Sequence, residues 1–342
     1  METRTGFLIQ LNDYQPGKIR GRIKPDSLVY CCTDQIADPA NLTAALEQII
    51  NETHECESTF ILQLPSELAA SEAFGDHEEL AYGLDVDYLH FDRSWTAEDI
   101  KKLALSLPSA VSVSGLSLQD RLWIHSHCPN VLFIHDYYRR KDTGLDQKVF
   151  EDLSEGIPKE EMVVFVPGTP LENRTGTELS TLENHRSQTS YAASVDLILQ
   201  GIGGMIYTSD ELSDMEMDMI QKASNGVFSI PASLNHPELY DQKFTIRSDS
   251  PALLKRLDEK PQGLQYPVAP DVPVARRPGF ITMDNANDPE SQGSVMICNG
   301  DYQADSSVNV IGHVCDYYLP VISLLENGAT IEFLRPVLDG CC

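Results

Sequence analysis

Residues 163–186 read VVFVPGTPLENRTGTELSTLENHR, and this stretch contains one complete strand–loop–helix pattern. The apolar run at 163–166 is typical of a buried strand, and Pro167-Gly168 ends it. A polar loop with Glu172, Arg174 and Glu178 follows, and a helix is predicted over 179–199. The stretch therefore predicts one βα unit with ionisable groups in its loop.

The same pattern recurs along the first part of the chain. Eight strands are predicted at 6–11, 27–32, 60–64, 88–91, 110–114, 131–134, 163–166 and 204–207. Helices are predicted at 41–50, 66–82, 96–107, 117–126, 146–153, 179–199 and 213–223. Alternating strands and helices indicate a parallel sheet, and eight repeats favour a closed (β/α)₈ TIM barrel over residues 1–226. A doubly wound open sheet is the alternative, although no GxGxxG or P-loop motif supports it.

Beyond residue 226 the helical periodicity mostly disappears. Strands are predicted at 227–231, 244–246, 279–283, 293–298, 308–314 and 329–333, with one helix at 250–257. These patterns predict a second, smaller and mostly β domain over residues 227–342.

The charge balance and the cysteines limit the classes of partner. The 342 residues include 25 Lys and Arg against 52 Asp and Glu, a net charge of −27, which argues against nucleic acid and anionic membranes as partners. No apolar run reaches the ~18 residues of a membrane span, and no signal peptide is visible, so we expect a cytoplasmic protein. The eight cysteines form no CxxC pair, so we expect reduced thiols, no metal site and no cofactor. A homo-oligomer is compatible with the sequence.

Candidate catalytic groups follow the predicted strands, because the active site of a TIM barrel lies at the C-terminal strand ends. Asp92 and Asp210 follow two of these runs, and paired carboxyl groups across a cleft suit glycoside hydrolysis. The alternative is that such acids only cap helices. His135 could be a general acid, a phosphate ligand or a structural histidine. The basic run at 139–141 indicates either an anion site or a solvated loop.

Several longer motifs resemble one family. They are HDYYRRKDTGL at 135–145, the 163–186 stretch, IYTSDELSD at 206–214, RSDS at 247–250, RRPGFITMDN at 276–285 and ADSSVNVIGHV at 304–314. With these motifs the chain resembles, as a divergent member, the bacterial 6-phospho-N-acetylmuramidases, which have a TIM barrel followed by a cyclophilin-like domain. The resemblance implies a cytoplasmic hydrolase of N-acetylmuramic acid 6-phosphate–N-acetylglucosamine, a disaccharide of cell-wall recycling.

The resemblance also implies roles for individual residues. Asp92 and Glu178 would be catalytic, with Asp210 as a further candidate. The implied substrate contacts are His135, Tyr137, Arg174, Glu183, His185 and Arg186 in the barrel, and Arg247 and Asp249 in the second domain.

The sequence departs from the family pattern at three places. One is residues 286–294, ANDPESQGS, where the family has Tyr, Arg-Tyr and Gly-Glu-Leu groups. Residues 111–115 read VSVSG, where the family has a Glu-Leu-Asn-like motif, and Ser307 replaces an arginine. Two other functions therefore stay open. One is a divergent, non-catalytic protein that binds a phosphosugar or glycan fragment. The other is a different barrel enzyme, such as a phosphosugar lyase or isomerase, although no strand end supplies the lysine that a Schiff base would need.

Overall fold

The computed structural model describes residues 3–17, 19–33, 42–66 and 82–336. The helix predicted at 66–82 lies outside these residues except at its two ends. The chain divides into two compact units, one of residues 1–190 and 200–213, and one of residues 191–199 and 214–342. The predicted domain boundary at residue 226 stays a prediction.

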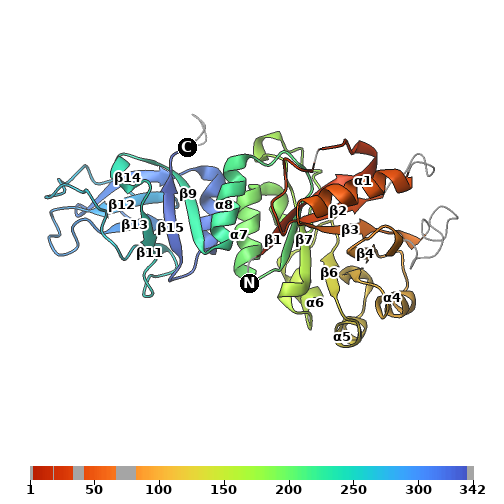
Figure 1. Ribbon diagram of the computed structural model, residues 1–342. Coiled ribbons are helices and arrows are strands. Elements are labelled where there is room, and N and C mark those ends of the chain that lie inside the picture. Colours follow the sequence, from red (N-terminus) through yellow and green to blue (C-terminus); the bar gives the residue numbers. More distant parts are fainter. Residues whose placement is uncertain (1–2, 18, 34–41, 67–81, 337–342) are drawn as a thin grey trace. The chain divides into compact units, whose positions relative to one another are not determined.

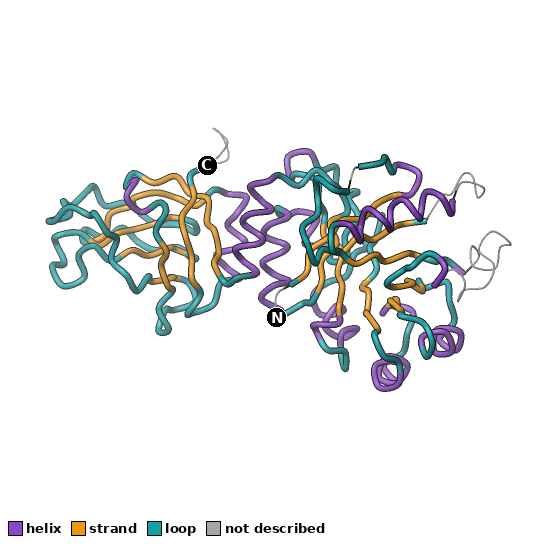
Figure 2. Tube along the Cα trace, in the orientation of Figure 1, coloured by secondary structure: helices purple, strands orange, loops and turns teal. Residues whose placement is uncertain are grey.

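The first unit contains a closed barrel of eight parallel strands (Figures 1 and 2). The strands are β1 (Arg4–Gln10), β2 (Leu28–Cys32), β3 (Thr59–Gln63), β4 (Tyr88–Phe91), β5 (Ser109–Ser112), β6 (Val131–His135), β7 (Met162–Val166) and β8 (Gly204–Tyr207). Each strand pairs with the next, and β1 pairs with β8 to close the barrel. The predicted (β/α)₈ barrel is therefore confirmed, and the open-sheet alternative is wrong.

Alternate residues of the strands fill the barrel interior. The buried core consists of Leu8, Leu28, Tyr30, Cys32, Ile61, Ala110, Ile134, Val163, Phe165 and Ile206. Because successive side chains of a strand point to opposite faces, the residues between these point outward toward the helices. This alternation decides which polar residues at the strand ends face the barrel axis.

Helices follow several of the barrel strands. They are α1 (Leu42–Glu55), α4 (Ala97–Ala104), α5 (Leu118–His127), α6 (Gln147–Ser154), α7 (Ser190–Gln200) and α8 (Asp214–Ser224). Ser117 and Asp120 form a capping box at the start of α5, and Asp146 accepts the Val149 N–H at 2.8 Å at the start of α6. Within the grouping into units, residues 191–199 of α7 and all of α8 belong to the second unit.

One predicted barrel helix starts too early. The helix expected at 179–199 begins only at Ser190. Ser180 instead pairs with Tyr138, and Leu182 pairs with Leu145, as isolated β-bridges. The helical periodicity of this segment was misleading because backbone pairing with a distant loop overrides local propensity.

The second unit contains a seven-stranded sheet in the order β10-β15-β9-β14-β12-β13-β11 (Figure 1). Its strands are β9 (Val227–Leu234), β10 (Lys243–Thr245), β11 (Leu254–Arg256), β12 (Phe280–Asp284), β13 (Val295–Cys298), β14 (Val308–Val314) and β15 (Thr330–Leu334). The expectation of a mostly β second part is confirmed, but the helix predicted at 250–257 is wrong. That segment contains β11, which pairs antiparallel with β13, and the helix α9 (Leu319–Leu324) was not predicted.

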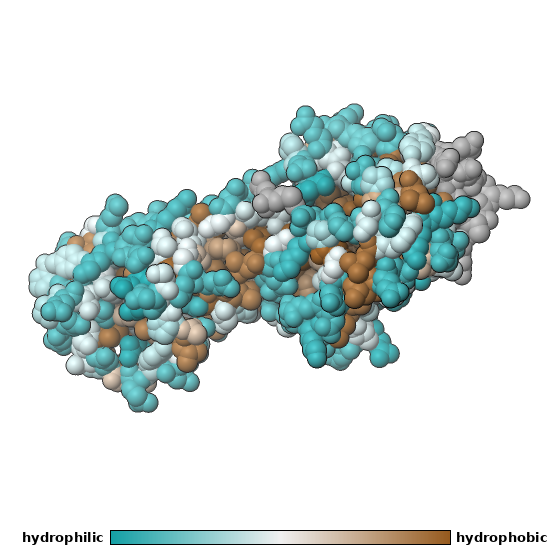
Figure 3. Space-filling model, turned by 90° about the horizontal axis from the view of Figure 1, so that it is seen from below, coloured by the Kyte–Doolittle hydropathy of each residue, from teal (hydrophilic) through white to brown (hydrophobic). Residues whose placement is uncertain are grey.

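Several bulk properties follow the sequence. Among the described helices, none is long and apolar enough to span a membrane. Hydrophilic residues cover most of the face shown in Figure 3, in keeping with the many acidic residues.

Cys31, Cys32 and Cys298 are buried free thiols in strands, as expected. Cys315 is disulfide-bonded, which corrects the expectation of reduced thiols there, because sequence spacing does not report a pairing that folding creates.

Candidate active site

A cavity of about 580 Å³ opens at the C-terminal ends of β2, β3, β4 and β6. This is the end of the barrel where TIM-barrel enzymes have their active sites. Its lining residues are Tyr30, Gln63, His90, Asp92, Arg93, Asp136, Tyr137, Tyr138, Arg139, Arg140 and Thr143. Among the described residues, the cavity therefore combines two carboxyl groups with three guanidinium groups.

Asp92, the first residue after β4, is one of these carboxyl groups. Its Oδ1 accepts the backbone N–H of Ser94 at 2.9 Å and the Ser94 hydroxyl. Its Oδ2 accepts a hydrogen bond from Gln63 Nε2 at 3.4 Å, which is longer and weaker. The two oxygens thus differ, because Ser94 donates to Oδ1 with two groups and Gln63 donates to Oδ2 at a longer distance.

Asp136, the first residue after β6, is the second carboxyl group of the cavity. Ser112 at the end of β5 donates to its Oδ1 at 2.6 Å, and Ser114 donates to its Oδ2 at 2.6 Å. Ser114 lies in the short 3₁₀ turn Val113–Gly115 that follows β5. Hydroxyl donors on both oxygens stabilise the ionised form of a carboxyl group and fix its orientation.

The positive charge of the cavity comes from Arg93, Arg139 and Arg140. The guanidinium of Arg139 lies 5.3 Å from the centre of the Tyr137 ring, and its Nη2 donates to the Tyr137 hydroxyl at 3.2 Å. The Tyr137 ring packs edge-on against Phe165 at 5.0 Å. The run Arg139-Arg140 therefore lies at a cavity, which favours the anion-site interpretation over a solvated loop.

Asp136 and Arg93 both follow predicted strands but were not selected as site residues, and His90 and Gln63 were missed. The signal for Asp136 was its position directly after an apolar run, the same signal that selected Asp92. The signal for His90 was a polar residue inside the otherwise apolar strand YLHF. Of the predicted site residues, Asp92 and Tyr137 line the cavity.

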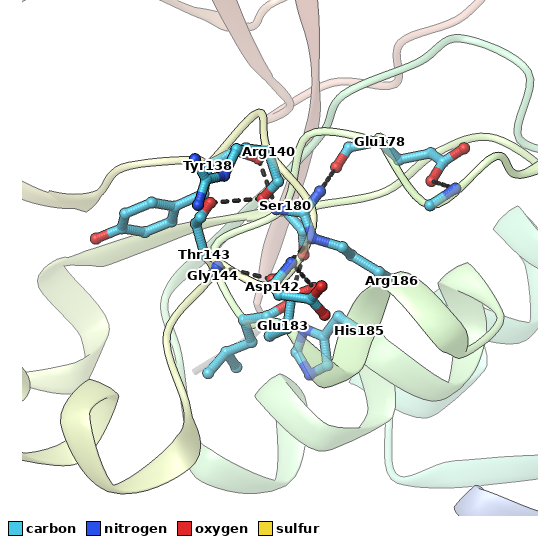
Figure 4. Close-up of polar contacts among 12 residues, drawn as sticks. Tyr138, Arg140, Asp142, Thr143, Gly144, Glu178, Ser180, Glu183, His185 and Arg186 are labelled. Carbon is cyan, nitrogen blue, oxygen red and sulfur yellow. Dashed lines mark hydrogen bonds and ion pairs between the residues drawn. The ribbon is translucent and has the colours of Figure 1, made fainter.

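Glu183 and Arg186 join two loops of the barrel (Figure 4). We call residues 136–146 the β6–α6 loop and residues 167–189 the β7–α7 loop. The carboxylate of Glu183 accepts the N–H groups of Asp142 at 2.9 Å and Gly144 at 2.7 Å, and binds Arg186 Nε at 3.0 Å. These hydrogen bonds and the Arg186 charge outweigh burial, which alone would raise the pKa of Glu183, and hold that pKa below its usual range.

Arg186 is buried and uses its donors on backbone carbonyls. Nη1 donates to the carbonyl of Glu178, and Nη2 donates to Tyr138 at 2.8 Å and to Arg140 at 3.4 Å. Figure 4 shows Arg186 reaching between the two loops. The arrangement supports a structural role for Arg186, which positions the backbone of the loop that carries Arg140.

Arg174 also binds the backbone. It donates to the carbonyls of Thr169 at 2.7 Å, His185 at 3.0 Å, Arg186 at 3.2 Å and Pro167 at 3.3 Å, to that of Gln188, and to the Ser190 hydroxyl at 3.1 Å. Such a set of contacts folds the β7–α7 loop around one guanidinium group. His185, in the same loop, is fully buried.

Glu178 and Asp210 are not among the described residues that line the 580 Å³ cavity. The Glu178 carboxylate accepts the N–H groups of Thr175 at 2.5 Å and Gly176 at 2.9 Å. Burial alone would raise the pKa of Glu178, but these backbone hydrogen bonds hold it below the usual range, which does not suit a general acid. Asp210 lines a smaller cavity of about 220 Å³ at the ends of β1 and β8, together with Asp13 and Arg22.

His135 points away from the barrel axis. It follows the inward-facing Ile134 and is buried, with Nε2 3.0 Å from the Ser154 hydroxyl of α6. Its ring centre lies 4.5 Å from that of Phe150. Burial, and then the charge of Arg121, lower the pKa of His135 to about 3, so its ring is neutral at physiological pH. The structure favours the structural interpretation of His135.

Arg247 and Asp249 belong to the second unit. Arg247 Nε and Nη2 bind the two carboxylate oxygens of Asp249 at 3.0 and 3.2 Å, and Arg256 binds Oδ2 at 2.8 Å. Their predicted contact with substrate stays a prediction. In the described parts of the chain, no three His, Cys, Asp or Glu residues gather where they could hold a metal ion.

Comparison with known proteins gives two family matches. The model described as 6-phospho-N-acetylmuramidase, N-terminal, matches residues 27–222, and the model described as 6-phospho-N-acetylmuramidase, C-terminal, matches residues 231–334. No curated protein matches the chain.

Two solved structures share the fold. One is a conserved protein of unknown function from Enterococcus faecalis, with a TM-score of 0.80, 19% identity, and coverage of 98% of this chain and 97% of that one. The other is an uncharacterized protein from B. cereus, with a TM-score of 0.78, 16% identity, and coverage of 98% of this chain and 100% of that one. At this identity the two structures support the fold alone.

Proposed function

Because the chain belongs to the 6-phospho-N-acetylmuramidase family of glycosidases, we propose that it hydrolyses N-acetylmuramic acid 6-phosphate–N-acetylglucosamine in cell-wall recycling. One observation carries the proposal: two carboxyl groups and three arginines line a single cavity at the C-terminal end of the barrel. Carboxyl pairs perform glycoside hydrolysis, and guanidinium groups bind phosphate and carboxylate.

In the proposed mechanism, Asp92 is the general acid and Asp136 is the carboxylate that acts on the anomeric carbon. Asp92 donates its proton to the glycosidic oxygen as the bond to the anomeric carbon breaks. Asp136 either attacks that carbon or removes a proton from the attacking water. The assignment rests on the hydrogen bonds, since both oxygens of Asp136 accept from serine hydroxyls, whereas Oδ2 of Asp92 receives only the 3.4 Å contact among the bonds described above.

Arg93, Arg139 and Arg140 are proposed to hold the anionic groups of the substrate. The overall charge of −27 disfavours an anionic ligand elsewhere on the surface, so local positive charge is needed at the site. The phosphate and the lactyl carboxylate of the substrate are both suitable partners for such a cluster.

The test is a hydrolysis assay on the phosphorylated and the unphosphorylated disaccharide, with free N-acetylglucosamine as the readout. The Asp92→Asn and Asp136→Asn variants should each lose about 10²–10⁴-fold in kcat on the phosphorylated substrate. Asp210→Asn is the matched control, because Asp210 lines the other cavity. Unchanged turnover in Asp136→Asn would overturn the proposed pair, and equal turnover of both substrates would overturn the role of the arginines.

A further inference from the structure

Three polar side chains lie buried inside the barrel next to the candidate active site. Tyr30 of β2, His90 of β4 and Ser112 of β5 are each 1% exposed. Polar groups in such a position need hydrogen-bond partners, because burial without them is costly. These three residues are hydrogen-bonded to one another in series, and the last of them, Ser112, is hydrogen-bonded to Asp136.

The hydrogen bonds between them run in one direction. Ser112 Oγ donates to Oδ1 of Asp136 at 2.6 Å, since an ionised carboxylate only accepts. The single hydroxyl proton of Ser112 is then used, so at the 3.1 Å contact His90 Nε2 must be the donor. Nδ1 of His90 is therefore the unprotonated nitrogen, and it accepts the Tyr30 hydroxyl at 2.7 Å.

The ionisation of these groups agrees with this direction. Burial lowers the pKa of His90, although the charges of Asp136 and Asp92 oppose the shift. Burial, and then the neighbouring Tyr137 and Cys32, raise the pKa of Tyr30 well above its ordinary value. Tyr30 thus keeps its proton and His90 stays neutral. This series of hydrogen bonds therefore transfers no charge, and the N–H and O–H dipoles in it all point toward Asp136.

We propose that Tyr30, His90 and Ser112 form a positioning relay that orients Asp136 and favours its ionised form for the hydrolytic step. The inference rests on the proposed function, in which Asp136 is the carboxylate that acts on the anomeric carbon. Ser114 also donates to Asp136, but from outside the relay. The two serines therefore offer a comparison between a hydrogen bond that is linked to His90 and one that is not.

The first test is a pH–rate profile of Tyr30→Phe, which removes the first donor of the relay and keeps the ring. The ionisable groups that line the cavity with Asp136 are Tyr30, His90, Asp92, Arg93, Tyr137, Tyr138, Arg139 and Arg140. We expect the acid limb of kcat/KM to move to higher pH by about half a unit to one unit, with about a 3- to 10-fold loss below that limb. The loss should appear in kcat more than in KM.

A double-mutant cycle separates the relay from a merely structural effect. In the Ser112→Ala background the relay is already broken, so Tyr30→Phe should add no further change in the acid limb. In the Ser114→Ala background the relay is intact, so Tyr30→Phe should keep its full effect. An equal effect in both backgrounds, or no effect in the wild-type background, would overturn the relay. Thermal unfolding of each variant shows whether it is folded.

The tautomer of His90 provides a readout without substrate. The ¹⁵N chemical shifts of the imidazole in protein labelled at histidine should show a proton on Nε2 and none on Nδ1. A proton on Nδ1 would contradict the relay whatever the enzyme does. If the wild-type protein does not hydrolyse the disaccharide, the proposed function fails, while this measurement still decides the direction of the hydrogen bonds.

Discussion

Glu183 and Arg186, three residues apart, form an ion pair of 3.0 Å whose two side chains also bind the backbone of a different loop. Glu183 accepts two N–H groups of the β6–α6 loop, and Arg186 donates to carbonyls of both loops. The resemblance to the family implied that both residues contact the substrate. The structure shows that their described partners hold the loops in place.

Glu183→Gln should therefore lower the stability of the barrel. The variant keeps the shape of the side chain but removes a charge that faces Arg186, whose side chain is only 4% exposed. We expect a loss of about 1–3 kcal/mol in the free energy of unfolding. Denaturant unfolding followed by tryptophan fluorescence measures it, because both tryptophans, Trp95 and Trp123, lie in the barrel unit. Glu172→Gln is the control, as Glu172 is an exposed carboxylate of the same loop, and an equal loss there would contradict the prediction.

The same pair predicts a pH dependence. The folded pKa of Glu183 lies below its ordinary value of 4.5, so its ionised form stabilises the folded state at pH values above 4.5. This contribution is lost as the pH falls through the lower, folded pKa. The difference in unfolding free energy between wild type and Glu183→Gln should be constant from pH 7 to 5 and shrink below that. A difference that grows on acidification would show that the sign is wrong.

The lowered pKa of His135 should make the effect of replacing this residue on stability depend on pH, with opposite signs at neutral and acidic pH. Its pKa is about 3 in the folded state against 6.5 ordinarily, so between these values the unfolded chain binds a proton that the folded chain does not. The contribution of His135 to the free energy of unfolding therefore falls as the pH drops below 6.5. At pH 7.5, His135→Gln should be less stable than wild type by about 1 kcal/mol, because the Ser154 hydrogen bond is disturbed.

Below pH 6.5 the difference between wild type and His135→Gln should shrink and change sign. Unfolding titrations of both proteins at pH 7.5, 6 and 5 measure it. A constant difference would mean that His135 is protonated in the folded protein. The acid limb of the pH–rate profile should be the same in both proteins, which separates His135 from the catalytic groups.

We expect Arg140 to help the protein discriminate between the phosphorylated and the unphosphorylated disaccharide. It lines the cavity and is exposed, so Arg140→Ala should raise KM for the phosphorylated disaccharide by about 10-fold. KM for the unphosphorylated disaccharide should change less. Lys141→Ala is the matched control, because Lys141 is the next cation along the chain and is not among the cavity residues of the described structure. Equal effects of the two variants would indicate a general charge effect rather than contact.

The barrel could be predicted from the sequence because its strands are short apolar runs bounded by clear breaks. The break at Pro167-Gly168 is an example, since a side chain on Gly168 would place a Cβ 2.2 Å from the carbonyl oxygen of Ser209. The segments at 179–189 and 250–257 were mispredicted as helices because their backbones pair with distant residues. Periodicity within a segment contains no information about such pairing.

The candidate site could be predicted only in part, for a related reason. Position after a strand identified Asp92, and it applies equally to Asp136. The partners of Arg174 and Arg186 are backbone carbonyls, and every residue of a chain has one, so no motif marks which carbonyl an arginine will meet. The serine donors to Asp136 lie at the end of β5 and in the turn that follows it, where the resemblance suggested only a departure from the family pattern.

The pairing of the β6–α6 and β7–α7 loops has a consequence for how this barrel can change over evolution. TIM barrels acquire new specificities by varying loops one at a time on a constant scaffold. Here Tyr138, Leu145 and Glu183 exchange backbone hydrogen bonds across the two loops, and Arg186 is inserted between them. An insertion in one loop would displace the other. These two loops must therefore change together in evolution, and both must be transferred together if they are grafted onto another barrel.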